Sequence, residues 1–303
     1  MNRRNFIRNV SLSAAALSIS DRVIPATLKE AGKRQKLFVG AHVWVYAASQ
    51  PGYDVSPILS RIFSDMAYAG FDGVETMEHP LRSTDYTKQI KELIDQYRIK
   101  LLGTSYGADM WDKNKHNQIL EDTDLILTNL ASAGGRTFGV SVGRPSGRKK
   151  TEEELDNQAA LLKGLIDLSN KKNIILNLHN HTYEVENNMY DLRGTLKRLP
   201  DVKLGPDLNW LLRGGVDPVK FLKEFRNQII FVHLRDQMNN GKWPESLGEG
   251  DVNFREISVV MDEIGFNGDV VIELAHENGF ATTRPLRESL KISRDYLKNT
   301  MNI

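Results

Sequence analysis

Four histidine or acidic side chains lie at matching places in the sequence, each at the end of a short apolar run. They are His179, Asp207, His233 and Glu273. Two imidazoles and two carboxylates form a ligand set that suits Zn²⁺, Mn²⁺, Fe²⁺ or Co²⁺, whereas Ca²⁺ prefers oxygen ligands. Any one of these residues would also fit a structural histidine or a helix cap. Their recurrence over four successive runs favours one shared divalent metal site.

A second histidine, His181, lies two residues after His179 in a His-Asn-His motif. His181 is an alternative to His179 as a metal ligand, because a sequence places the end of a strand only to within one or two residues. The ligand set therefore contains one position with two candidates.

These residues need a scaffold that brings the ends of separate runs together. Eight apolar runs alternate with amphipathic stretches, and their starts lie 26 to 41 residues apart. This spacing accommodates a strand, a helix and two loops. Eight such units close an α/β fold, the (β/α)8 TIM barrel, in which chemistry gathers at the carboxyl ends of the strands. The predicted strands are Leu37–Val45, Gly73–Met77, Ile99–Tyr106, Arg136–Val142, Ile174–Leu178, Val202–Leu208, Ile229–Leu234 and Val270–Leu274.

The stretches between the runs carry the start signals of helices. Ser56-Pro57 is typical of an N-cap followed by the first helical position. Thr151 and Glu154 have the spacing of a capping box, and Asp217-Pro218 predicts a further helix start. No linker rich in Pro, Gly and Ser divides residues 36–303, so we expect a single barrel domain there.

Six short motifs, taken in order, resemble the xylose isomerase-like TIM barrels, the sugar phosphate isomerase/epimerase superfamily that also contains endonuclease IV. The resemblance extends over residues 36 to about 297 and implies the same barrel. The motifs are Phe71-Asp72-Gly73-Val74-Glu75, His179-Asn180-His181-Thr182-Tyr183-Glu184, Gly205-Pro206-Asp207-Leu208-Asn209-Trp210, Val232-His233-Leu234-Arg235-Asp236, Leu247-Gly248-Glu249-Gly250-Asp251 and Val271-Ile272-Glu273.

The family pattern places Glu, Asp, His and Glu as metal ligands on strands five to eight. Asp207, His233 and Glu273 match this pattern, and His179 stands where the first Glu is expected. In the epimerases of the family, the two glutamates hold the metal and exchange protons on opposite faces of the sugar. Because His179 replaces one of these glutamates, the chain does not fit that symmetric two-glutamate mechanism. The His-Asn-His motif resembles a subgroup that includes inosose dehydratase-like and keto-glycoside-cleaving proteins.

The resemblance implies a divalent-metal-dependent carbohydrate isomerase or epimerase, which abstracts a proton next to a sugar carbonyl through a metal-stabilised enediolate. The predicted catalytic residues are Glu273, His181 and Glu184, with His179 as a further candidate for the base. An enediolate can instead expel a β-leaving group, so a 3-keto-glycoside lyase or a keto-polyol dehydratase is the alternative. Less favoured are an endonuclease IV-like phosphodiesterase, which needs more ligands and a basic DNA face, and a non-catalytic sugar-binding protein.

Aromatic and charged residues near the predicted strand ends are candidates for binding a small carbohydrate. Aromatic faces stack on C–H surfaces, and arginine binds oxygen atoms in pairs. Each tryptophan also fits a packing role, and Arg235 also fits an ion pair with Asp236. The loop Gln237–Asn253 is expected to cover the barrel mouth. The predicted substrate-binding residues are His42, Trp44, Glu75, Trp111, Arg144, Trp210, Arg235 and Glu249.

The composition excludes several other kinds of chemistry. The chain contains no cysteine, which excludes disulfides, Cys-ligated metals and thiol nucleophiles. The 40 basic and 39 acidic residues give a net charge of +1, without the basic excess of a nucleic-acid-binding protein. No Gly-x-Gly-x-x-Gly motif follows a strand and no P-loop is present, so we expect no nucleotide cofactor.

Residues 1–30 differ from the remainder of the chain. Asn2–Arg8 is basic, and Val10–Ile19 is a mildly apolar run that is too short to span a bilayer. Arg3-Arg4 resembles the twin-arginine export signal, whose cargo crosses the membrane folded. We therefore predict an exported, periplasmic protein, with an ordinary basic N-terminal helix as the alternative. No later segment has the length and apolarity of a membrane span.

Overall fold

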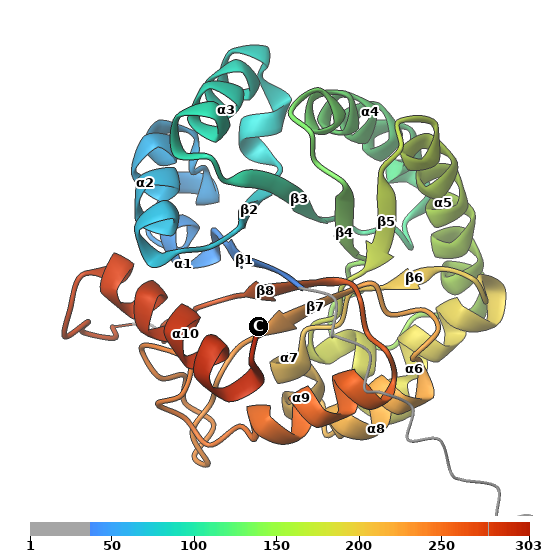
Figure 1. Ribbon diagram of the computed structural model, residues 1–303. Coiled ribbons are helices and arrows are strands. Elements are labelled where there is room, and N and C mark those ends of the chain that lie inside the picture. The colour runs from blue at the N-terminus through green and yellow to red at the C-terminus, as the bar shows by residue number, and fades with distance from the viewer. Residues whose placement is uncertain (1–36, 278) are drawn as a thin grey trace, which may run out of the picture. The chain divides into compact units, whose positions relative to one another are not determined.

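The computed structural model describes residues 37–277 and 279–303. Within them, eight parallel strands form one sheet in the order β6-β5-β4-β3-β2-β1-β8-β7, and helices surround the strands (Figure 1). Two isolated parallel bridges, Leu204 to Ile229 and Asp207 to His233, bring the segments of β6 and β7 together. The predicted (β/α)8 barrel is thus confirmed. The predicted leader over residues 1–30 lies outside the described residues.

Each predicted apolar run overlaps one strand. The strands are β1 (Phe38–His42), β2 (Gly73–Met77), β3 (Lys100–Gly107), β4 (Thr137–Ser141), β5 (Ile175–Leu178), β6 (Lys203–Leu204), β7 (Phe231–Leu234) and β8 (Asp269–Ile272). The helices are α1 (Trp44–Ala47), α2 (Leu59–Ala69), α3 (Thr84–Tyr97), α4 (His116–Ser132), α5 (Glu152–Lys171), α6 (Thr182–Arg198), α7 (Leu208–Arg213), α8 (Pro218–Glu224), α9 (Phe254–Glu263) and α10 (Leu286–Met301). Short 3-10 turns are η1 (Pro51–Tyr53), η2 (Ser56–Ile58), η3 (His79–Arg82) and η4 (Lys113–Lys115).

β1 and β6 are the strands that fall furthest short of their predicted runs, and both end early at the functional end of the barrel. β1 ends at His42, because the chain turns into α1 at Trp44. β6 has only two residues, since Pro206 lacks the N–H group that a longer ladder would need. The ladder resumes at Asp207 as a single bridge to His233, so the last predicted residues of the run still lie on the barrel wall.

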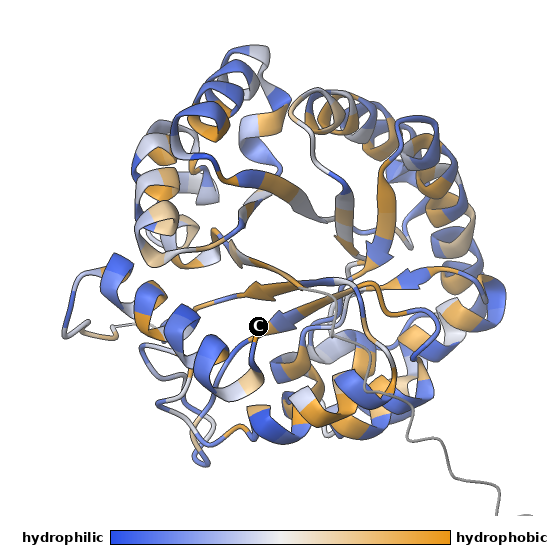
Figure 2. Cartoon of the chain, in the orientation of Figure 1, coloured by the Kyte–Doolittle hydropathy of each residue, from blue (hydrophilic) through white to orange (hydrophobic). Residues whose placement is uncertain are grey.

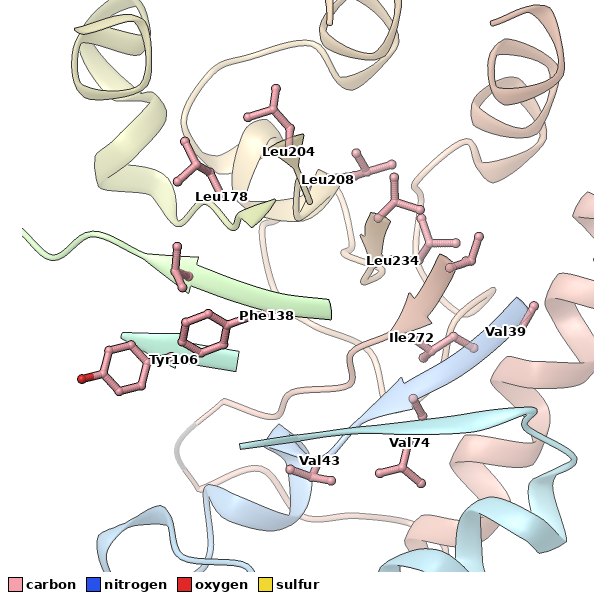
Figure 3. Packing of buried hydrophobic residues seen from close by; sticks show 14 of the residues in the cluster. Val39, Val43, Val74, Tyr106, Phe138, Leu178, Leu204, Leu208, Leu234 and Ile272 are labelled. Atoms are coloured by element: carbon pink, nitrogen blue, oxygen red, sulfur yellow. The ribbon is translucent and has the colours of Figure 1, made fainter. Parts of the chain in front are cut away.

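The core has two parts, because successive side chains of a strand point to opposite faces. Apolar residues on the outer face of the strands, among them Val74, Phe138 and Ile272, pack with the apolar sides of the helices (Figures 2 and 3). A second, smaller cluster of Leu102, Phe231 and Val271 is separate from this shell. Buried polar side chains, among them His42 and His233, lie at the carboxyl ends of the strands.

Two of the three predicted helix starts agree with their signals, whereas Ser56 is not an N-cap: Val55 precedes the turn and Ile58 precedes α2, both without a side-chain cap. Thr151 and Glu154 form a complete capping box at the start of α5, and the Asp217 carboxylate accepts two backbone N–H groups at the start of α8. Ser56-Pro57 begins a 3-10 turn that leads directly into α2. Among the described residues, no helix combines the length and apolarity that a membrane crossing requires.

Candidate metal and active site

The carboxyl ends of the strands open into a cavity of about 730 Å³. This cavity is the barrel mouth at which the sequence places the chemistry. Predicted site residues that line it come from β1 and β7, from the segments that follow β5, β7 and β8, and from α1 and α7. They are His42, Trp44, His179, His181, Trp210, His233, Arg235 and Glu273.

Two of the predicted ligands, His179 and His233, turn the same ring nitrogen toward each other. His179 directly follows β5 and His233 lies within β7, and their Nδ1 atoms are 3.1 Å apart. Two nitrogens bound to one zinc-like ion at about 2.0–2.1 Å would be separated by roughly 3 Å. The imidazole pair therefore already has the spacing of two ligands of one ion.

Asp207 completes a group of three potential ligands. Its Oδ1 accepts the backbone N–H groups of Asn209 at 2.8 Å and Trp210 at 3.0 Å, which caps α7. Its Oδ2 is buried and has no hydrogen-bond partner among the described residues, although the Arg235 guanidinium lies 3.5 Å away. One potential ligand atom each from His179, Asp207 and His233 lies within 4.8 Å of the others. This donor set fits a first-row divalent cation.

Glu273, the fourth predicted ligand, reaches the same place but is also ion-paired. Its Oε2 is 3.5 Å from His233 Nδ1, while its Oε1 accepts a hydrogen bond from Arg235. Burial opposes ionisation of Glu273, but Arg235 and the surrounding histidines hold its pKa well below the usual range. Glu273 is therefore a carboxylate, and a poor proton acceptor, at neutral pH.

Glu75 was predicted to bind sugar, and the structure places it against a metal-ligand candidate instead. The carboxylate is 1% exposed and accepts a 2.5 Å hydrogen bond from His233 Nε2. Burial opposes the charge on His233, but Glu75, followed by Glu273 and Asp207, raises its pKa to about 9. A carboxylate behind the distal ring nitrogen is the usual arrangement around metal-binding histidines, because it fixes the ring's orientation and tautomer.

His181 and Glu184, both predicted to be catalytic, lie in different surroundings. His181 lines the cavity, its ring is 5.0 Å from that of His179, and burial lowers its pKa to about 4. It is therefore a neutral imidazole at pH 7. The Glu184 carboxylate accepts the backbone N–H groups of His181 and Val142 and does not line the cavity. Burial raises its pKa to about 8.

Three predicted substrate-binding residues lie away from the cavity wall. Trp111 and Arg144 follow β3 and β4, and Arg144 lies over the ring of Tyr183, 5.3 Å from its centre, beside a second depression. Glu249 accepts a 2.5 Å hydrogen bond from Arg284. The structure therefore does not bring Trp111, Arg144 or Glu249 together with the ligand candidates.

The loop over residues 237–253 brings Trp243 into the cavity, as its length predicts. Trp243 donates its indole N–H to Asn209 at 2.9 Å, and Arg235 lies over its ring, 4.9 Å from the centre. Asp236 accepts backbone N–H groups of the loop, including Gly248 at 2.8 Å and Gly250 at 2.9 Å. Asp236 thus anchors the loop, while Arg235 pairs with the site.

Sequence reasoning missed four residues of this region. Ser105 follows the same strand-end rule on β3 and bonds His42 Nε2 at 2.9 Å, so the rule applied to that strand would have found it. Asn180 bonds the backbone of Asp207 through both ends of its amide, and its place between two histidines was the signal. His276 and Tyr53 line the cavity from loops that carry no recognisable motif.

Comparison with known proteins agrees with the barrel fold described above. The family model described as "Xylose isomerase-like TIM barrel" matches residues 63–299. An inosose dehydratase of Clostridium tetani is 25% identical over 274 residues, which cover 78% of this chain and 88% of that protein.

Two solved structures share the fold. The D-allulose 3-epimerase from Methylomonas sp. has a TM-score of 0.68 at 17% identity, covering 88% of this chain and 98% of that one. The 3-keto-D-glucoside 4-epimerase from E. coli has a TM-score of 0.64 at 17% identity, covering 88% of this chain and 100% of that one. At these identities the two structures bear on the fold alone.

Proposed function

The chain belongs to the xylose isomerase-like TIM barrel family, and we propose that it is a carbohydrate enzyme that removes a proton from the carbon next to a sugar carbonyl. One observation carries this proposal. His179, His233 and the buried Asp207 Oδ2 converge at one wall of a large cavity that also presents the neutral imidazole of His181. The name of the inosose dehydratase relative supports the same class of activity.

The proposed cofactor is one divalent cation. His179, Asp207 and His233 would hold it, with Glu273 as the fourth residue. When bound, a Zn²⁺, Mn²⁺, Co²⁺ or Fe²⁺ ion supplies a Lewis acid that draws charge from a carbonyl oxygen and acidifies the neighbouring C–H bond.

Other residues around the cavity are proposed to accept the proton, to hold Glu273 and to bind the sugar ring. His181 is the proposed base, because it lines the cavity as a neutral imidazole at pH 7. Arg235 binds Glu273 and keeps it ionised. Trp210, whose ring centre lies 5.6 Å from that of His181, offers a face on which a sugar ring can stack beside the base.

The arrangement of carboxylates bears on the fate of the deprotonated sugar. Return of a proton to the same or a neighbouring carbon gives isomerisation or epimerisation, which is the leading proposal. β-Elimination, as in a dehydratase or a 3-keto-glycoside lyase, is the second candidate. One observation supports this second candidate. Glu273 is ion-paired with Arg235, and His179 occupies the position of the other family glutamate, so these two positions do not supply a pair of free carboxylate bases.

The test is ¹H NMR in D₂O, with the metal-loaded full chain and a panel of keto-sugars, inososes and 3-keto-glycosides. We expect loss of the signal of the proton next to the carbonyl, accompanied by an isomer, an epimer or an eliminated product. His181→Gln should lower kcat by roughly 10²–10⁴-fold while the metal content stays unchanged. His116→Gln, which alters a histidine hydrogen-bonded to Met110 outside the cavity, is the matched control.

Two results would contradict this proposal. If no compound of the panel exchanges deuterium or is converted, the chain binds sugar without transforming it or has another activity. If His181→Gln loses the metal, His181 is a ligand and another residue is the base.

A further inference from the structure

We propose that the Ser105 hydroxyl binds the substrate as a hydrogen-bond donor to one of its oxygen atoms, and that His42 is the positioning residue that gives Ser105 this role. The inference rests on the proposed function in one respect, because it takes the ligand of the cavity to be a sugar. Ser105 lies on β3 and His42 at the end of β1, and both residues line the cavity.

The protonation of the His42 ring follows from its contacts. Its Nδ1 accepts the backbone N–H group of Trp44 at 3.0 Å, so this nitrogen carries a lone pair and no proton. That contact excludes both the imidazolium ion and the tautomer with a proton on Nδ1. The ring proton is therefore on Nε2, which lies 2.9 Å from Ser105 Oγ. His42 thus donates to Ser105 and does not accept from it.

Ser105 consequently keeps its own proton for another partner. A serine hydroxyl has one proton and two lone pairs, and His42 uses one of the lone pairs. In the part of the chain that the structure describes, the Ser105 hydroxyl makes no further hydrogen bond to the protein. The residue is half-buried and lines the cavity. Its proton is therefore available to a ligand in the cavity.

The strands beside Ser105 do not supply the missing acceptor. Ser105 is in register with Met77 on β2 and with Gly139 on β4, and both of these residues line the cavity as well. Gly139 has no side chain, and the sulfur of a methionine is only a weak acceptor. An oxygen atom of the ligand is therefore the partner that we assign to Ser105.

His42 also brings Ser105 close to the residues of the proposed metal site. The His42 Nδ1 atom is 3.9 Å from Glu273 Oε2, and the centre of its ring is 5.5 Å from that of His233. One imidazole ring thus separates the Ser105 hydroxyl from these two residues. A sugar whose carbonyl lies beside them carries further oxygens on its neighbouring carbons, and one of these is the acceptor for Ser105.

The donor role defines the chemical group that Ser105 recognises. A hydroxyl, ether or carbonyl oxygen has a lone pair that can accept a hydrogen bond, whereas an ammonium or a methylene group has none. Ser105 does not transfer its proton to the substrate, because replacing that proton from His42 would leave an imidazolate ring. Its role is therefore to bind and orient the sugar, whichever product the deprotonated sugar gives.

The first experiment tests the donor assignment on the wild-type chain loaded with Zn²⁺. Long-range ¹H–¹⁵N NMR of the histidine side chains distinguishes the two tautomers of a neutral ring, and His42→Gln identifies the signals that belong to His42. We expect His42 to carry its proton on Nε2. A proton on Nδ1 would overturn the inference, because Ser105 would then have to donate to His42.

The second experiment identifies the oxygen atom by NMR titration with methyl β-D-glucopyranoside and its 2-, 3-, 4- and 6-deoxy forms, none of which carries a keto group. Ser105→Ala should weaken binding of the parent sugar by roughly three- to tenfold, the effect of one neutral hydrogen bond. In the wild type, one deoxy form should lose the same factor, and in Ser105→Ala that form and the parent should bind equally. The amino sugar with nitrogen at that position should bind no better than the deoxy form.

Two further variants show whether the effect belongs to the hydroxyl. Ser105→Thr keeps a hydroxyl group and should retain the discrimination against that deoxy form. Ser132→Ala removes a hydroxyl that is bonded to the Asn129 carbonyl on α4, away from the cavity, and is the matched control. Its affinities should equal those of the wild type.

The outcomes separate this inference from the proposed function. If the wild type and Ser105→Ala lose the same affinity on removal of each sugar hydroxyl, no oxygen depends on Ser105 and the inference is overturned, even when the keto-sugar panel is converted. If one deoxy form shows the dependence on Ser105 but no compound of the panel is converted, Ser105 binds sugar as inferred and the proposed function falls.

Discussion

At the scale of single residues, the site depends on a carboxylate that sits behind a ligand candidate. Glu75 and His233 are both almost completely buried and are joined by a 2.5 Å hydrogen bond. This contact leaves His233 Nδ1 directed toward His179 and Glu273. The orientation of one imidazole thus comes from a residue on the far side of the ring.

Replacing Glu75 by Gln should weaken metal binding by roughly 10–100-fold, because the amide cannot stabilise the ring with a full negative charge. The measurement is a titration of the metal-free protein with Zn²⁺ and Mn²⁺, with far-UV circular dichroism to show that the variant is folded. Glu121→Gln, an exposed change on α4, is the control. Unchanged affinity in Glu75→Gln would show that the contact only supports packing.

The chemical type of residue, and its place at a strand end, predicted several of the side chains that reach the cavity, although Trp111, Arg144 and Glu249 lie elsewhere. His179, His233 and Glu273 are found there because parallel strands in a barrel share one functional end. Glu75 obeyed the same rule, but its partner lies 158 positions away. No local pattern distinguishes a carboxylate that faces a sugar from one that faces a histidine.

At the scale of elements, the turn from β5 into α6 combines a helix-capping contact with the base candidate His181. His181 is the N-cap of α6, and Glu184 returns its carboxylate to the His181 backbone N–H at 2.8 Å. Within α6, three consecutive residues from Asn187 to Met189 have positive φ values. The capping contact therefore fixes the base candidate at the start of an irregular helix.

Glu184→Gln tests this turn through the pH dependence of stability. The folded-state pKa of Glu184 is about 8, above the ordinary 4.5, because the carboxyl is buried. Its contribution to stability is therefore complete below pH 4.5 and is lost as the pH rises through 8. The free energy of unfolding of the wild type should fall relative to that of Glu184→Gln over this interval.

Urea unfolding at both ends of the interval measures the difference. Glu121→Gln serves again as the control and should show a gap that does not change with pH. A pH-independent gap for Glu184→Gln would mean that Glu184 is ionised throughout and acts only as a cap.

The elements themselves were largely predictable, and their exact ends were not. The capping signals at Thr151 and Asp217 act within one helical turn, so the sequence displays them completely. The length of β6 depends on how the chain around Pro206 pairs with the neighbouring strand, and Tyr53 reaches the cavity with a positive φ that its residue type does not predict. Both are consequences of tertiary packing, which local patterns do not contain.

At the scale of the whole molecule, we propose that the barrel is exported in its folded state. The proposal rests on Arg3-Arg4 and the apolar run after them. Changing both residues to Lys should retain most of the protein in the cytoplasm. Immunoblots of periplasmic and cytoplasmic fractions measure this, with Arg8→Lys as the matched control. Unchanged delivery of the double variant would exclude the twin-arginine route.

We propose that His179, Asp207, His233 and Glu273 together hold one divalent cation beside the cavity. Asp207 and His233 should matter most, because Asp207 Oδ2 has no hydrogen-bond partner among the described residues and His233 is positioned by Glu75. The most direct test is elemental analysis of folded Asp207→Ala and His233→Ala proteins beside the wild type. We expect one metal ion per wild-type chain and loss of most of it in both variants. Full metal content with normal turnover in both would contradict the proposed site.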